Sequence, residues 1–258
     1  MSFPNVPGKH TFPAIVEPAD MLAHRRRGGR LPRIQPLHGV VICLQNGLPE
    51  RNRRRVRVQR LGRLMGDLYS VRSTGGRVAV LTGFGLGAPI VAAQAEELIA
   101  LGARQIVSIA LAGGLQPDLP PGSIVVATGA IRDEGTSHHY LPAGREIASD
   151  AGLVEALSAA LERQGIRYER GLTWSTDAPY RETGEEVAAY AGQGVLVVDM
   201  ELAALLAVAQ VRGVAAAAVL VAGDSLAGGH WTPPERLDEM ERSLDLAYRA
   251  AIEVLDAR

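Results

Sequence analysis

The chain has 258 residues, of which 47% are hydrophobic and 21% charged, and its formal net charge is −1. This balance is typical of a globular protein with a sizeable core and excludes a disordered chain. A net charge so close to zero gives no reason to expect nucleic acid or a membrane as a partner. We find neither a signal peptide nor a run of about 18 apolar residues, so the sequence predicts a cytoplasmic protein.

Prolines punctuate residues 1–37, which we expect to form an N-terminal arm and not a domain of their own. The arm holds one short helical candidate, Ala19–Arg27, and we expect it to wrap the core or a neighbouring subunit. Its Arg25–Arg27 cluster is interpreted as a solvated helix end, with a phosphate or nucleic-acid patch as the less favoured alternative.

From Gly39 onward, strand and helix patterns alternate along the chain. Strands are predicted at Val40–Leu44, Arg77–Leu81, Gln105–Leu111, Ser123–Ala127, Tyr168–Thr173, Gly194–Val198 and Ala216–Val221. Helices are predicted at Ile90–Ala100, Ser149–Gln164, an Ala/Leu run after residue 201, and Arg236–Asp256. The alternation predicts residues 38–258 to form a single α/β domain, in which helices flank both faces of a central mixed sheet.

Two residue types that often carry chemistry are interpreted here as structural. Cys43 is the single cysteine and lies in an apolar run, so we expect a buried thiol and not a nucleophile. His138 and His139 would point to opposite sides of an extended segment, and no Cys, His, Asp or Glu spacing completes a site with them. The sequence therefore predicts neither a metal nor another cofactor.

The segment Asp199-Met200-Glu201 joins a predicted strand to the Ala/Leu helix. A carboxylate at such a junction lies at the carboxyl end of a strand, where open α/β sheets bind ligands. Glu201 could accept hydrogen bonds from the vicinal hydroxyls of a ribose, with Met200 as an apolar surface beside it. The alternative is that the acid only complements the dipole of the following helix. The segment by itself favours neither interpretation.

Asp224 follows the next predicted strand and so occupies the equivalent strand-end position. One carboxylate for a sugar and one for a leaving group would suit glycosyl transfer, whose oxocarbenium-like transition state needs negative surroundings and a proton for the departing base. The polar segment Thr173–Glu182 adds the aromatic side chains of Trp174 and Tyr180, which suit a planar heterocycle. A surface loop with a satisfied salt bridge is the alternative for that segment.

Two glycine-rich turns follow strands, at Thr82–Gly87 and Ala112–Leu115. The first precedes a predicted helix, so its amides could hold an anion at the helix N-terminus. It lacks the glycine spacing and the later acidic residue of a dinucleotide fingerprint. Tight packing is the commoner reason for such a turn.

Six blocks of the sequence, taken in order, resemble the nucleoside phosphorylase superfamily in its uridine phosphorylase-like and nucleosidase branch. They are Gly47–Arg51, Gly85–Pro89 with Glu96–Leu98, Ala112–Leu115, Arg132–Ser137, Ser175–Thr183, and Asp199–Glu201 with Gly223–Asp224. The resemblance runs from about Gly39 to Ser225. It implies an α/β nucleoside phosphorylase-like domain over residues 38–258, cleavage of the N-glycosidic bond of a nucleoside substrate, and assembly as a homodimer or hexamer.

The resemblance also implies roles for individual residues. Glu201 and Asp224 would be the catalytic pair, with Asp224 protonating the base. Ribose would be bound by Asp199, Met200 and Glu201. The base would lie against Tyr180, Arg181 and Glu182, beside Trp174. Inorganic phosphate, as co-substrate, would be held by Gly47, Arg51, Gly85 and Ser108. His10 is the candidate for a histidine that reaches the sugar of a neighbouring subunit, although its spacing to Gly47 is long.

The phosphate-binding part departs from the family pattern at three places. Ser108 stands where phosphorylases usually carry an arginine, Ala110-Leu111 replaces a Gly-Thr or Gly-Ser pair, and Leu48 replaces an aspartate. Losing an arginine and a hydroxyl removes about 3–5 kcal/mol of phosphate binding, at roughly 1.5–3 kcal/mol per charged hydrogen bond. We therefore expect this pocket to be impaired, rearranged or not used for phosphate.

Three hypotheses about function follow from these residues. Phosphorolysis of a nucleoside is favoured. A hydrolytic nucleosidase, with water activated by Glu50 or Asp199, is the first alternative. A nucleoside-binding protein without activity is the second, although intact Glu201 and Asp224 speak against it.

Overall fold

The computed structural model describes residues 6–29, 31 and 34–257. A central mixed sheet organises this part of the chain, with the strand order β10-β6-β8-β9-β5-β1-β4-β3-β2 and β7 paired to β6. The strands are β1 (Gly39–Cys43), β2 (Val58–Arg63), β3 (Asp67–Val71), β4 (Val78–Thr82), β5 (Gln105–Gly114), β6 (Ile124–Asp133), β7 (Glu146–Ala148), β8 (Glu169–Thr176), β9 (Val197–Asp199) and β10 (Ala215–Ser225). A further pairing between β10 and β5 closes β5, β10, β6, β8 and β9 into a ring.

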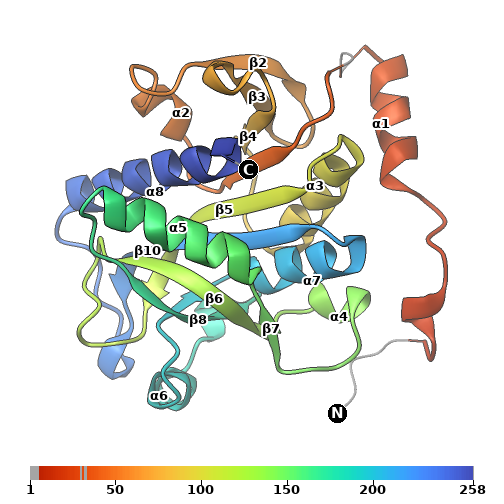
Figure 1. The fold of residues 1–258 in the computed structure, drawn as a ribbon. Coiled ribbons are helices and arrows are strands. Elements are labelled where there is room, and N and C mark those ends of the chain that lie inside the picture. Colours follow the sequence, from red (N-terminus) through yellow and green to blue (C-terminus); the bar gives the residue numbers. More distant parts are fainter. Residues whose placement is uncertain (1–5, 30, 32–33, 258) are drawn as a thin grey trace.

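Helices cover both faces of the sheet, as the sequence predicts (Figure 1). They are α1 (Pro18–Arg27), α2 (Leu48–Arg51), α3 (Ala88–Ala100), α4 (Ser137–Tyr140), α5 (Ala151–Arg163), α6 (Gly184–Gly192), α7 (Leu202–Arg212) and α8 (Leu237–Ala257). Short 3-10 turns lie at η1 (Lys9–Thr11), η2 (Arg72–Thr74), η3 (Pro179–Arg181) and η4 (Ala227–Gly229). Helices α3 and α7 share one apolar cluster, and α5 and α8 share another on the opposite face.

The central strands show why their sequences are uniformly apolar. All five residues of β1 are buried. Val40 and Ile42 belong to the cluster under α3 and α7, whereas Val41 and Cys43 belong to the cluster under α5 and α8. Successive side chains of a strand point to opposite faces, so a strand covered by helices on both sides is apolar at every position. Cys43 is fully buried, which confirms the prediction of a buried thiol, and this burial raises its pKa.

Every predicted strand and helix is present, although the strand expected from Gly194 begins only at Val197. The hairpin of β2 and β3 and the short strand β7 were not predicted. β2 lies at the edge of the sheet, and none of its side chains is fully buried, so it lacks the alternation that identifies a half-buried strand. Charged side chains cross the hairpin, where Arg60 and Arg63 contact Asp67 at 2.8 and 3.4 Å. Arginines on an edge strand also discourage pairing with another chain.

One local prediction was wrong. His138 and His139 lie in α4 and not in an extended segment, because Glu134 accepts the amide of Ser137 and starts a helical turn there.

In the described part of the chain, no group of three or more His, Cys, Asp or Glu residues could hold a metal ion. No helix among the described residues is long and apolar enough to cross a membrane.

The arm packs along its own chain (Figure 1). Leu22 of α1 is buried in the cluster under α3, and Arg25 forms a 2.9 Å ion pair with Glu97 of α3. Nearer the N-terminus, His10 of η1 is 3.1 Å from the carbonyl oxygen of His138 in α4. The arm therefore contacts both α3 and α4 of the same molecule.

Gly129 supplies a test of the sheet. A Cβ atom at Gly129 would lie 2.5 Å from the carbonyl oxygen of Ile147 on β7, beside the bulge where β6 pairs with β8. We expect Gly129→Ala to lower the free energy of unfolding by about 2–3 kcal/mol, because backbone must move. Gly192→Ala is the control, since a Cβ there meets nothing within 4 Å and alanine favours a helix. Equal stabilities of the two variants in denaturant unfolding would contradict this packing.

Candidate functional site

The predicted catalytic carboxylates come together around the carboxyl end of β5. Gly113 pairs with Val198 of β9 on one side and with Asp224 of β10 on the other. A Cβ atom on Gly113 would lie 2.9 Å from Val198 Cγ1 and 3.2 Å from Asp224 Oδ1. A side chain at this position would therefore crowd the side chains of both neighbours. The segment Asp199-Met200-Glu201 therefore begins beside the strand end that carries Asp224.

Asp199 is buried, with 5% of its surface exposed, and accepts four hydrogen bonds. Oδ1 accepts the hydroxyls of Thr173 and Ser175 at 3.1 and 2.6 Å. Oδ2 accepts the amides of Glu201 and Leu202 at 3.0 and 2.7 Å. Burial raises the pKa of Asp199, and these hydrogen bonds offset that rise only in part. Both oxygens are thus committed to holding β8, β9 and the start of α7 together.

Glu201 is 5% exposed and stands at the first residue before α7, but its side chain does not cap that helix. The two amides at the helix start bond to Asp199 instead. Oε1 of Glu201 accepts the amide of Gly87 at 2.7 Å, and Oε2 accepts the amide of Met200 at 3.2 Å. Burial, with the charge of Asp199 nearby, raises the pKa of Glu201 to about 7. Helix capping therefore does not explain this glutamate.

The glycine-rich turn Thr82–Gly87 lies against this carboxylate. Gly87 is the residue before α3 and has φ 104°, a conformation that favours glycine. The sequence predicted that amides of this turn could hold an external anion. In the structure, the amide of Gly87 donates to Glu201. Gly85, predicted to bind phosphate, is exposed on the same turn. The turn is thus joined to the candidate ribose site by a direct hydrogen bond.

Asp224 has a partner that the sequence did not reveal. The indole Nε1 of Trp231 donates to Asp224 Oδ2 at 2.8 Å. Glu182 follows η3. Burial, and to a smaller extent the nearby charge of Asp224, raises the pKa of Glu182 to about 7. Tyr180 and Arg181 of η3 are exposed. The side of the site expected to face the base therefore carries two acidic groups and one exposed indole.

The predicted contact between Trp174 and a base is not supported. Trp174 is 1% exposed and belongs to the cluster under α6. Its indole donates to Asp133 at 2.9 Å, and its ring centroid lies 4.6 Å from that of Tyr190. The polar neighbours of Trp174 in the sequence favour contact with a planar ligand, whereas its ring lies in the core.

The residues predicted to hold phosphate differ in their partners and burial. Arg51 donates from Nε and a terminal nitrogen to Asp245 Oδ1 at 3.1 and 3.0 Å. Ser108 is 4% exposed in the middle of β5, between Ile42 and Ala218 of the adjacent strands. Leu111 lies nearer the strand end, in contact range of Gly223. Gly47 precedes α2 with φ 83°. An apolar side chain therefore stands at the end of β5, and the arginine is paired elsewhere.

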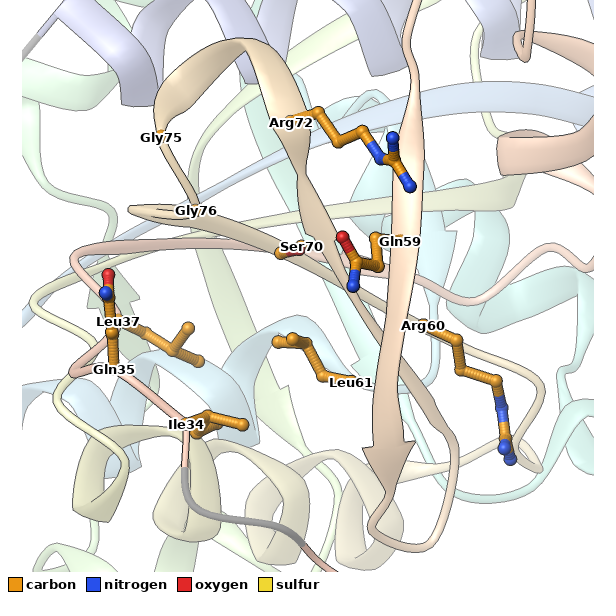
Figure 2. A pocket seen from close by; sticks show the side chains of 10 residues that line it. All are labelled: Ile34, Gln35, Leu37, Gln59, Arg60, Leu61, Ser70, Arg72, Gly75 and Gly76. Carbon is orange, nitrogen blue, oxygen red and sulfur yellow. The ribbon is translucent and has the colours of Figure 1, made fainter.

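A hollow of about 490 Å³ lies away from these residues, between the arm and the β2–β3 hairpin. Figure 2 shows Ile34, Leu37 and Leu61 facing it, while the guanidinium of Arg60 points away. None of the predicted site residues lines this hollow. The candidate functional site therefore stays at the strand ends beside Gly113, away from this hollow.

The sequence and the fold are both similar to those of known proteins. A family model described as "Phosphorylase superfamily" matches residues 38–257. The uridine phosphorylase of Treponema pallidum (strain Nichols) is 32% identical over 183 residues, which cover 66% of this chain and 69% of that protein. The DeoD-type purine nucleoside phosphorylase of Myxococcus xanthus (strain DK1622) is 35% identical over 182 residues, covering 67% and 75%.

A guanosine phosphorylase of Halorubrum lacusprofundi is 32% identical over 174 residues, covering 67% of this chain and 72% of that protein. Among solved structures, a uridine phosphorylase from Vibrio fischeri ES114 superposes with a TM-score of 0.72 at 24% identity, covering 88% of this chain and 94% of that one. The superposition shows that the two chains share a fold.

The different duties of Asp199 and Glu201 can be separated by unfolding. Asp199→Ala leaves the amides of Glu201 and Leu202 without an acceptor, and we expect it to lower the free energy of unfolding by about 2–5 kcal/mol. Glu201→Gln keeps one acceptor oxygen and removes a buried charge, so we expect a change below about 1 kcal/mol at pH 8. Urea denaturation measures both.

The pH dependence of this comparison has a definite sign. Because the pKa of Glu201 is raised to about 7 in the folded protein, the native state favours the neutral carboxyl, and its contribution to stability falls as the pH rises through 7. Glu201→Gln should therefore be more stable relative to the wild type at pH 8 than at pH 5. A larger loss of stability in Glu201→Gln than in Asp199→Ala would overturn the assignment.

Proposed function

The chain belongs to the phosphorylase superfamily, as an enzyme of the nucleoside phosphorylase type, and on that premise we propose that it cleaves the N-glycosidic bond of a nucleoside by phosphorolysis. The products are a free base and a (deoxy)ribose 1-phosphate. The observation that carries the proposal is the position of Asp224 and of Val198, which leads into Asp199-Met200-Glu201, on either side of the same strand end at Gly113. Relatives named as uridine, guanosine and purine nucleoside phosphorylases support this reaction.

Glu201 is proposed to bind the ribose hydroxyls. Each of its oxygens accepts one backbone amide, and a carboxylate oxygen can accept more than one hydrogen bond. The remaining lone pairs would take the two hydroxyls, and Met200, which is half-buried, would contact the sugar carbons. Asp199 supports this arrangement by holding the start of α7, and we assign it a positioning role without sugar contact.

Asp224 is proposed to supply the proton that the departing base needs. An oxocarbenium-like sugar gains stability from nearby negative charge, which Glu201 provides when it is ionised. Glu182 lies near Asp224 with a pKa of about 7, so it is partly protonated at neutral pH at the end of the site expected to face the base. Tyr180 and Arg181 precede it on η3 and would contact the base from the surface.

The phosphate part of the site is proposed to be atypical. Arg51 is paired with Asp245 at 3.0 Å, Ser108 is buried, and Leu111 places an apolar group at the end of β5. Hydrolysis is the second candidate function, because these three features together lower the expected affinity for a phosphate dianion. Asp199 is an unsuitable base for activating water, since both its oxygens are committed to four hydrogen bonds.

One assay distinguishes these functions. Purified protein is incubated with adenosine, guanosine, inosine, uridine and thymidine, with and without phosphate, and free base and sugar 1-phosphate are measured. Base release that requires phosphate is the expected result. Release without phosphate, yielding free ribose, would establish hydrolysis instead. Binding without release, seen by calorimetry, would show a nucleoside-binding protein without activity.

Glu201→Gln tests the residue that carries the proposal. Losing charge-assisted hydrogen bonds to two hydroxyls is expected to lower kcat/KM at least 100-fold, at roughly 1.5–3 kcal/mol per bond. Glu155→Gln is the matched control, because Glu155 lies on α5 and pairs with Arg170 at the surface. If both variants retain wild-type turnover, Glu201 does not bind the ribose.

A further inference from the structure

Trp231 combines a fixed nitrogen with an uncovered ring. Its side chain is 64% exposed, yet Nε1 donates to Asp224 Oδ2 at 2.8 Å. Most of a tryptophan's surface is apolar, so leaving the ring in solvent forfeits the burial free energy that usually orders it. A ring held in this way beside a catalytic carboxylate is available to a ligand.

The segment that carries Trp231 is built onto the strand end. Residues Ser225 and Thr232 exchange two backbone hydrogen bonds of 3.0 and 2.8 Å, which closes the loop between them. Leu226 donates its amide to the carbonyl of Gly114 at 2.8 Å. Gly229 approaches Gly184 of α6 closely, as a Cβ at Gly229 would lie 3.5 Å from the Cα of Gly184. Trp231 therefore extends from a loop that is anchored to both β5 and β10.

The hydrogen bond that Trp231 donates also distinguishes the two oxygens of Asp224. Oδ2 receives the indole N–H, whereas Oδ1 lies over Gly113, 3.2 Å from where its Cβ would be. Gly113 is the residue that pairs with Val198, just before Asp199-Met200-Glu201. The oxygen left free is thus the one on the side of the candidate ribose site.

We propose that Trp231 is a positioning residue for Asp224 and forms the surface on which the nucleobase lies. This inference rests on the function proposed above. The indole N–H fixes Asp224 so that Oδ1 faces the bond to be broken, and the exposed ring offers a planar apolar face to a planar heterocycle. A purine or a pyrimidine fits this chemistry, because stacking on an indole depends on the flat π-face of the base and not on its substituents.

Two substitutions separate the two duties. Trp231→Phe keeps an aromatic ring and removes the N–H, so we expect kcat to fall about tenfold with KM changed less than threefold. Trp231→Ala removes both, so kcat falls similarly and KM also rises at least tenfold. His230→Ala controls for disturbance of the loop, because His230 is exposed and contacts Gly228 of its own turn. Wild-type kcat in Trp231→Phe, or an unchanged KM in Trp231→Ala, would overturn the corresponding duty.

A measurement without turnover distinguishes failure of this inference from failure of the proposed function. The indole N–H resonance of Trp231 is identified as the one missing from the ¹⁵N spectrum of Trp231→Phe. We expect it to shift in Asp224→Ala and on addition of adenosine or uridine, but not in Glu155→Gln. If no nucleoside is cleaved while these shifts occur, Trp231 is confirmed beside Asp224 and the proposed reaction is wrong. If nucleosides are cleaved and the chemical shift of the Trp231 indole N–H is unchanged in Asp224→Ala, the positioning role is wrong.

Discussion

The carboxylate of Asp199 is the constraint on which the candidate site depends. It is buried and satisfied by two hydroxyls from β8 and two amides from the start of α7. Ser175 extends the arrangement by accepting the amide of Ala203 at 3.1 Å. A buried carboxylate with fewer donors would cost several kcal/mol, so these elements are held in one relative position. In that position Asp199 accepts the amides at the start of α7, so the Glu201 side chain does not cap the helix.

Glu201 then links parts of the chain that are distant in sequence. Its hydrogen bond from Gly87 joins the start of α3 to the start of α7, while the pairing of β5 with both β9 and β10 brings Asp224 to the same edge. The candidate ribose and base ends of the site are thus joined by contacts within this chain. The phosphate end lacks a comparable arrangement, since Arg51 is paired with Asp245 and Leu111 is apolar.

The sequence predicted the parts of the fold whose pattern is set by burial. The apolar runs of β1, β4 and β10 are covered on both faces, and α8 carries apolar residues along one side only, so periodicity identified them. The β2–β3 hairpin was not predicted, because an exposed edge strand needs no alternating pattern.

For the site, the strand-end rule predicted that Glu201 and Asp224 lie at one edge of the sheet. It could not predict the structural role of Asp199, because the partners Thr173 and Ser175 come from another strand. Alternate polar residues on an otherwise apolar strand were the available signal. Trp174 and Trp231 both have polar neighbours in the sequence, and only the tertiary structure shows that one ring is buried and the other exposed.

The central claim is that an ionised Glu201 accepts the hydroxyls of a ribose. Calorimetric titration of the wild type and Glu201→Gln with a nucleoside substrate between pH 5.5 and 8.5 tests it most directly. Because the pKa of Glu201 is raised to about 7, the account predicts that wild-type affinity increases as the pH rises through 7, while the affinity of Glu201→Gln is weak and independent of pH. Equal affinities of the two proteins across this range would contradict it.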